Sequence, residues 1–162
     1  MIKKLKRYIL EGNIEEALKI IETFSNEKND LALPILLELF ETTDNNIVRN
    51  QIALALSDIG NTVVIEPLIK MILNPKTQKS RGTLLYSLKS FECSHHLSLF
   101  IKLLSDRSFE VSREAFSLIE SSLKNVSNFD KEEYINLLQK EIELVNDRLV
   151  LLTEAKELFL DD

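Results

Sequence analysis

The chain repeats itself at an interval of 32 residues. Three arginines stand at this spacing, at Arg49, Arg81 and Arg113. Apolar residues also recur every 32 residues at six positions in each of three units. In the first unit these positions are Leu36, Leu37, Leu39, Phe40, Ile52 and Ile59. Self-similarity at a fixed period is typical of repeat proteins, in which each unit packs on its neighbours. The period therefore limits the possible folds more than any single motif does.

Each unit holds two apolar stretches with helical spacing. In the first unit the shorter stretch is LPILLELF, and the longer one is IVRNQIALALSDIG at residues 47–60. Apolar residues recur at i, i+3, i+4 and i+7 in both stretches, which predicts amphipathic helices. Three glycines and three prolines are too few for an all-β fold with many tight turns. We expect helix pairs near residues 31–60, 64–91 and 97–125.

The flanks of the repeats also have helical patterns. Gly12 and Asn13 divide the N-terminal flank into two helices, whereas Asn146 and Asp147 form only a weak break near the C-terminus. Residues 131–160 are therefore either part of a helix pair or one long helix. The expected organisation is a single domain over residues 1–162, with an N-terminal helix pair at 1–30, three repeats at 31–125 and a C-terminal helix pair at 126–162.

A lone helix hairpin cannot bury its apolar stripe, but stacked hairpins can. In the longer stretch of the first unit, one helix face carries Ile52, Ala55, Leu56 and Ile59, which should pack inward. The expected fold class is therefore all-α, a right-handed α-solenoid of stacked antiparallel helix hairpins.

The longer stretch of the first unit resembles the second helix of HEAT-like repeats, particularly the short bacterial form, whose pattern reads roughly V-R-x-x-A-x-x-A-L-x-x-I-G. The matching residues are Val48, Arg49, Ala55, Leu56, Ile59 and Gly60, with Ile52 in place of the first alanine. The second unit keeps Arg81, Leu88 and Phe91, and the third keeps Arg113. The resemblance covers about residues 31–125. It implies a concave protein-binding surface and a mostly structural arginine, and it implies no particular activity.

Charge is distributed unevenly along the chain. Residues 1–102 carry 13 Lys or Arg and 12 Asp or Glu, whereas residues 103–162 carry 7 and 14, a net charge of −7. Binding to nucleic acid requires a basic face, so we expect no nucleic-acid partner. A protein partner drawn to the C-terminal part should be basic.

The compartment can also be inferred from composition. A single cysteine, Cys93, excludes an internal disulfide and is consistent with a reducing compartment. No apolar run approaches the roughly 20 residues that a membrane span requires. We expect an unanchored, cytoplasmic protein.

Two polar clusters could carry chemistry. The arginine column could bind carboxylates or phosphates, or each arginine could bond a helix-end carbonyl. We favour the structural role, because no further basic residues gather around the column. Glu92, Cys93, His95 and His96 are possible zinc ligands, but no second cluster accompanies them, so we expect no metal.

Paired carboxylates occur at three places, Glu15-Glu16, Glu132-Glu133 and Glu141/Glu143. Acid–base catalysis needs carboxyl groups whose pKa values a pocket pushes apart, whereas these pairs have the spacing of solvated helix faces. No phosphate-binding loop or nucleophile motif is present in the sequence. We therefore expect no catalytic residue and no cofactor.

These observations favour a non-catalytic protein-binding solenoid whose acidic C-terminal surface binds a basic protein. The candidate partner-binding residues are Asn50, Gln51, Asp58, Glu114, Glu120, Asp147, Glu154 and Glu157. The most specific hypothesis is a bacterial immunity protein that neutralises a toxin such as a nuclease, since an acidic inhibitor mimics the field of a polyanionic substrate. The alternatives are a general scaffold or assembly adaptor, a HEAT-like lyase or maturation subunit, and a nucleic-acid base glycosylase. The sequence does not indicate an oligomeric state.

Overall fold

The computed structural model describes residues 1–158, and at Phe129 it describes the backbone alone. Every regular element in this part of the chain is helical, without a strand, so the all-α prediction is confirmed. Contacts divide the chain into two compact units, Met1–Cys93 and Ser94–Asp162, where the sequence predicted one domain.

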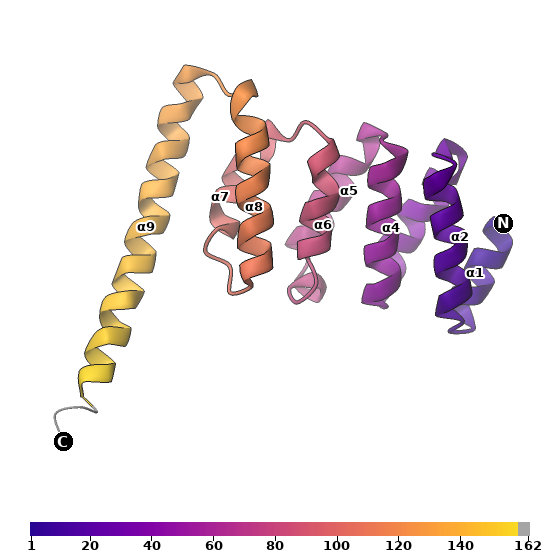
Figure 1. Cartoon of the computed structure of the whole chain (residues 1–162), viewed down its shortest axis with the longest axis horizontal. Helices are drawn as coiled ribbons and strands as arrows, with labels where there is room; N and C mark the ends of the chain where they lie inside the picture. The colour runs from indigo at the N-terminus through magenta and orange to yellow at the C-terminus, as the bar shows by residue number, and fades with distance from the viewer. Residues whose placement is uncertain (159–162) are drawn as a thin grey trace. The chain divides into compact units, whose positions relative to one another are not determined.

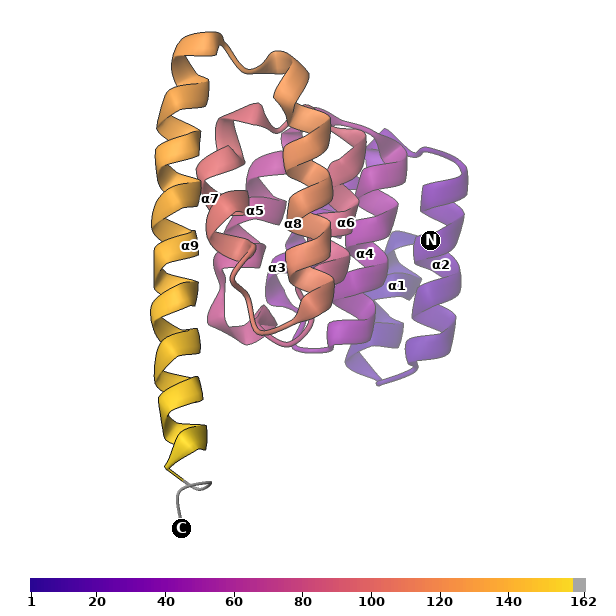
Figure 2. The ribbon, with the colours of Figure 1, turned by 60° about the vertical axis from the view of Figure 1, so that its left-hand side comes forward.

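The first unit contains six α-helices in chain order. They are α1 (Ile2–Leu10), α2 (Ile14–Asn26), α3 (Leu33–Thr42), α4 (Asn46–Ile59), α5 (Ile65–Leu73) and α6 (Gly82–Ser87) (Figure 1). Four 3-10 turns accompany them, η1 (Asp30–Ala32), η2 (Thr62–Val64), η3 (Pro75–Thr77) and η4 (Leu88–Ser90). Helix α1 packs on α2, α3 on α4 and α5 on α6, as the predicted pairs require. Helix α4 also contacts α2 and α6, so these three second helices lie side by side (Figure 2).

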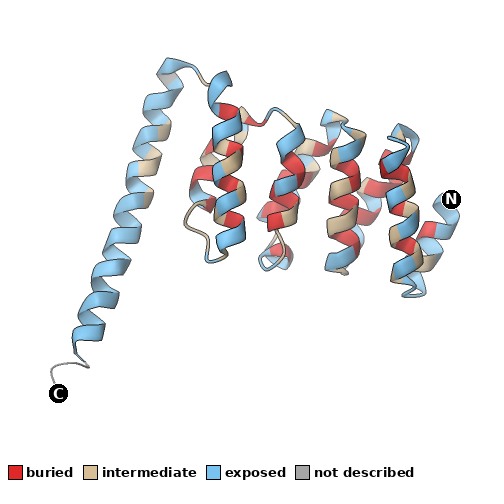
Figure 3. Ribbon diagram, viewed as in Figure 1, coloured by how far each residue is buried: buried red, intermediate tan, exposed pale blue. Residues whose placement is uncertain are grey.

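Helix α4 forms the centre of this unit's core. At its start, the Asn45 side chain accepts hydrogen bonds from the backbone N–H groups of Ile47 and Val48 at 2.9 and 3.1 Å. At its end, Gly60 adopts the left-handed conformation with φ of +81°, which glycine tolerates best. Its buried residues are Val48, Arg49, Ile52, Ala53, Ala55 and Leu56 (Figure 3). Ile59, predicted to face inward, is half-buried.

The sequence period is also a period of local structure. Turns η1, η2 and η5 (Ser94–His96) begin at residues 30, 62 and 94, and the helices that follow them begin at residues 33, 65 and 97. The side chains of Asn29 and Asn61 each accept a hydrogen bond of 3.1 Å from the backbone N–H two residues later. The same turn thus introduces the first helix of successive pairs.

The second unit holds α7 (Leu97–Leu103), α8 (Phe109–Ser122), the turn η6 (Leu123–Asn125) and α9 (Asn128–Glu157). Helix α7 packs on both α8 and α9. The predicted helix pair near residues 97–125 is therefore confirmed. Its buried apolar residues are Leu97, Phe100, Ile101, Leu103, Val111, Ala115 and Leu118.

A single helix of 30 residues, α9, occupies most of the region where a C-terminal helix pair was predicted at 126–162. The prediction of a pair is wrong for the described residues, and the alternative of one long helix is correct. Asn146 and Asp147 lie inside the helix because neither is glycine or proline, and each costs only a few tenths of a kcal/mol in a helix interior. At 1.5 Å per residue, α9 is about 45 Å long. Residues 159–162 lie outside the described part of the chain.

Candidate functional site

Polar side chains connect the second helices of the first unit. Ser25 Oγ on α2 donates a hydrogen bond to Asp58 Oδ2 on α4 at 2.5 Å, and Asn50 Nδ2 on α4 donates to Thr83 Oγ1 on α6 at 3.3 Å. The two residues of each pair are 33 positions apart. Partner binding was predicted for Asn50 and Asp58. Their hydrogen bonds also join neighbouring helices. Gln51, also nominated, is half-buried.

A polar groove of about 560 Å³ lies at the C-terminal ends of α2, α4 and η4. Its lining residues are Ser25, Asn26, Lys28, Ser57, Asp58, Gly60 and Ser90. Ser57 Oγ and Ser90 Oγ are 3.1 Å apart, again with an offset of 33. Helix C-termini carry partial negative charge, and Asp58 adds a carboxylate. The groove can accept hydrogen-bond donors, and Asp58 is the one nominated residue that lies in it.

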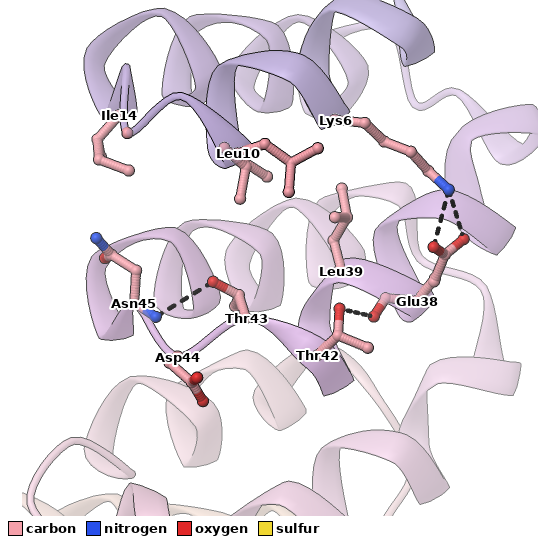
Figure 4. A pocket seen from close by; sticks show the side chains of 11 residues that line it. Lys6, Leu10, Ile14, Glu38, Leu39, Thr42, Thr43, Asp44 and Asn45 are labelled. Atoms are coloured by element: carbon pink, nitrogen blue, oxygen red, sulfur yellow. Dashed lines mark hydrogen bonds and ion pairs between the residues drawn. The ribbon is translucent and has the colours of Figure 1, made fainter.

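A second groove, of about 710 Å³, lies between α1 and α3 and is lined by apolar and polar side chains (Figure 4). Lys6 Nζ bridges the two helices through hydrogen bonds of 2.8 and 2.9 Å to the Glu38 carboxylate. Leu10 and Leu39 project into the space between the helices, and Leu10 is 87% exposed. The sequence interpretation missed this groove because it considered only the second helices. In the sequence, the feature that could have indicated this groove is the apolar Leu10, which lies two positions before Gly12.

The arginine column begins with a buried member. Arg49 is 1% exposed, and its guanidinium donates hydrogen bonds to the backbone carbonyl of Thr43 and to Asn46 Oδ1. Thr43 is the C-cap of α3, so this arginine closes the end of the preceding helix. Burial lowers the pKa of the guanidinium, and the nearby Asp44 acts in the opposite direction. The hydrogen bond from Arg49 to the carbonyl at the end of α3 is the contact expected for a structural arginine.

The other two arginines are progressively more exposed. Arg81 is half-buried and donates to the backbone carbonyl of Ile72, in the last turn of α5, at 3.5 Å. Arg113 on α8 is exposed. The three positions share a sequence register, but they do not form one row of equally accessible guanidinium groups.

In the second unit, α8 carries two of the nominated carboxylates. Glu120 is exposed, whereas Glu114 is half-buried with its Oε2 atom shielded from solvent. A charged group that is partly withdrawn from water is a poorer contact for a partner than an exposed one. Of the two, Glu120 is the better candidate for binding.

Helix α9 presents an exposed acidic face. Asp147, Glu154 and Glu157 were nominated from the sequence, and all three are exposed. Glu143 is exposed too and lies four positions before Asp147, one helical turn away on the same side. Its Oε1 atom accepts a hydrogen bond of 3.2 Å from Gln139. These four carboxylates, Glu143, Asp147, Glu154 and Glu157, form the acidic face of α9.

The possible zinc ligands differ in accessibility. Cys93 is 1% exposed, and its Sγ lies 3.9 Å from the Leu88 carbonyl, whereas His95 is exposed and His96 is half-buried. Burial raises the pKa of the Cys93 thiol to about 11, and Glu92 and Glu66 add to the shift. A thiol with this pKa is almost fully protonated near neutral pH and is a weak nucleophile.

Among residues 1–158, His, Cys, Asp and Glu side chains form no group of three that could hold a metal ion. Within the same residues, none of the helices combines the length and apolarity needed to cross a membrane. No protein-family model matches the sequence, and no curated protein or solved structure is significantly similar to it.

Proposed function

We propose that this chain is a non-catalytic, HEAT-like protein-binding solenoid whose C-terminal acidic surface binds a basic protein partner. The observation that carries the proposal is the acidic face of α9, where four exposed carboxylates share one side of a helix. Exposed charges of one sign accelerate encounters with an oppositely charged protein at little cost in desolvation.

The repeat character is supported by contacts inside the first unit. Hydrogen bonds with an offset of 33 residues join α2 to α4 and α4 to α6. Equivalent turns precede α3, α5 and α7 at intervals of 32 residues. Stacked helix pairs of a right-handed α-solenoid would produce such nearest-neighbour contacts, and their exposed faces commonly bind proteins.

One specific form of this function is the neutralisation of a basic toxin, such as a nuclease, by an immunity protein. A nuclease surface is basic because its substrate is polyanionic, and the acidic face of α9 offers the complementary charge. A general adaptor would use the same face for a basic partner of another kind. Nothing among the described residues favours a lyase, maturation or glycosylase role.

The proposal is tested by reversing the acidic face. The variant Glu143→Lys, Asp147→Lys, Glu154→Lys, Glu157→Lys changes only exposed positions. The control variant reverses four exposed carboxylates of the first unit, Glu11, Glu15, Glu22 and Glu27. Each protein is immobilised and exposed to cell extract at low and high salt, and a stoichiometric bound protein is identified by mass spectrometry.

We expect a basic partner that binds the parent chain and the control but not the α9 variant. Its association rate with the parent should fall about tenfold or more as salt rises, because charge steering is screened. A partner that binds the α9 variant as well as it binds the parent would contradict the proposal.

A further inference from the structure

Helix α9 carries an apolar stripe beside its acidic face. Ile135, Ile142 and Leu149 recur every seven residues, and an apolar residue follows each of them three positions later. The complete stripe consists of Ile135, Leu138, Ile142, Val145, Leu149 and Leu152. Alternating steps of three and four are the heptad spacing that lines the seam between two helices in a coiled coil. This spacing is independent of the 32-residue period.

The helices of the second unit leave most of this stripe uncovered. Helix α7 spans only seven residues, about 10 Å, and Ser105 just beyond it donates a hydrogen bond of 2.9 Å to Glu141 Oε2 in the middle of α9. A shallow groove of about 230 Å³ remains there, lined by Leu104, Ser105, Leu138, Glu141, Ile142, Val145 and Asn146. Farther along α9, Leu149 and Leu152 remain 59% and 69% exposed.

We propose that this stripe is a self-association surface, on which a second copy of the chain docks its own α9 in the antiparallel direction. In the register that pairs every apolar position, Ile135 faces Leu152 of the second copy. Leu138 then faces Leu149, and Ile142 faces Val145. Two-fold symmetry repeats each pairing, so six apolar layers form along about 27 Å of helix.

Charge selects the antiparallel direction. Glu141 and Arg148 flank the stripe on the same side, one heptad apart. In the antiparallel register, Glu141 of each copy lies beside Arg148 of the other copy, so two ion pairs form. In a parallel pair, Glu141 would instead lie beside Asn146, and Arg148 beside Thr153. The chain therefore gains complementary charge only when the two helices run in opposite directions.

The acidic face of α9 remains outside this interface. Glu143, Asp147 and Glu154 lie across the helix from the stripe, as their spacing relative to Ile142 and Leu149 requires. A dimer formed through the stripe therefore leaves the acidic faces of both copies open. The inference does not depend on the proposed function, because the two use different sides of the same helix.

The first test compares two leucines that lie two positions apart. Leu149→Asn changes the stripe, whereas Leu151→Asn changes a leucine of similar exposure, 65%, off the stripe. Sedimentation equilibrium of the full chain should show a concentration-dependent dimer for the parent and for Leu151→Asn. Leu149→Asn should weaken dimerisation at least tenfold, because each dimer contains the substitution twice. A parent chain that stays monomeric at several hundred micromolar, or equal effects of the two substitutions, would overturn the proposal.

The second test exchanges the charges. Glu141→Arg alone and Arg148→Glu alone should each weaken dimerisation by about tenfold, since each replaces two ion pairs by two like-charge contacts. The double variant should recover the parental association, although it cannot restore the hydrogen bond from Ser105. Failure of the double variant to recover, with helicity intact by circular dichroism, would refute the antiparallel register.

The third test distinguishes the two directions directly. Ile135→Cys and Leu152→Cys are prepared as separate proteins, and a disulfide between copies requires α-carbons within about 7 Å. The mixture should form a cross-linked dimer on oxidation, whereas neither protein should do so alone. The buried Cys93 of the parent serves as the background control. Cross-linking of Ile135→Cys with itself would indicate a parallel pair and overturn the assignment.

Discussion

Helices α4 and α9 have similar apolar patterns, but they obtain their stability in different ways. Helix α4 buries six of its 14 residues against α2, α3 and α6. In α9, which is more than twice as long, no residue whose burial the structure describes is buried (Figure 3). Packing therefore stabilises α4, whereas length and local propensity stabilise most of α9. An apolar pattern predicts a helix in both cases, but it does not predict whether the helix lies in a core.

The largest difference should appear when one leucine is shortened in each helix. Leu56→Ala in α4 removes a side chain with no exposed surface, and we expect a loss of about 2–5 kcal/mol in the free energy of unfolding. Leu149→Ala in α9 should cost about 0.5 kcal/mol or less, because its side chain is already largely solvated. Urea denaturation at low micromolar protein concentration measures both values. Equal losses would show that α9 is packed in solution.

Thiol reactivity provides the next comparison. Cys93 has a pKa raised to about 11 by burial, so near pH 8 only about a thousandth of it is thiolate. A cysteine placed by Leu151→Cys on exposed α9 should have an ordinary pKa. We expect iodoacetamide to modify the α9 thiol at least about 100-fold faster than Cys93 in the native protein, as followed by mass spectrometry.

The raised pKa of Cys93 also makes the free energy of unfolding depend on pH. The unfolded state loses the Cys93 proton near pH 8.5 to 9, whereas the folded state retains it until about pH 11. The folded state therefore binds more protons in this interval, and stability falls as pH rises through it. Cys93→Ala should reduce this loss. Rapid alkylation of native Cys93 at pH 8 would contradict its burial.

The three arginines of the column should show the smallest differences in stability, graded by how deeply each side chain is buried. Arg49→Ala should lower the free energy of unfolding by about 1–3 kcal/mol, because it leaves the buried Thr43 carbonyl without its donor. Arg81→Ala should cost less, since Arg81 is only half-buried, and Arg113→Ala should change stability by about 0.5 kcal/mol or less. Thermal denaturation of the three variants checks the order. A large loss for Arg113→Ala would indicate a contact formed only in solution.

The sequence was most informative where local and periodic signals agreed. The positions of α3, α4, α5, α7 and α8 follow from apolar spacing and from turns at a fixed interval. The first unit's longer stretch finishes at Gly60, and α4 ends there because Gly60 adopts a left-handed conformation that side chains disfavour. In contrast, the weak break at Asn146 and Asp147 left a helix pair and one long helix both possible, since residues of modest propensity interrupt a helix only when packing favours a turn.

The candidate site was less predictable because exposure depends on the neighbours of each residue. Asp147, Glu154 and Glu157 were correctly placed on an exposed helix. Asn50 was predicted to bind a partner, but its side chain donates a hydrogen bond to Thr83 on α6. The α1–α3 groove depends on two helices separated by more than twenty residues, and no local pattern shows how closely they pack.

The recurring asparagine turn has a consequence for changes in chain length. Asn29 and Asn61 form the same hydrogen-bonded turn ahead of α3 and α5. Deletion of residues 29–60 would join Lys28 directly to Asn61, so the chain would meet an equivalent turn at the junction. Duplication of the same segment would place an equivalent asparagine at the new junction. Shorter or longer deletions that start after Lys28 would put a different residue at that position, so at this junction a step of 32 residues is the change in length that keeps the turn.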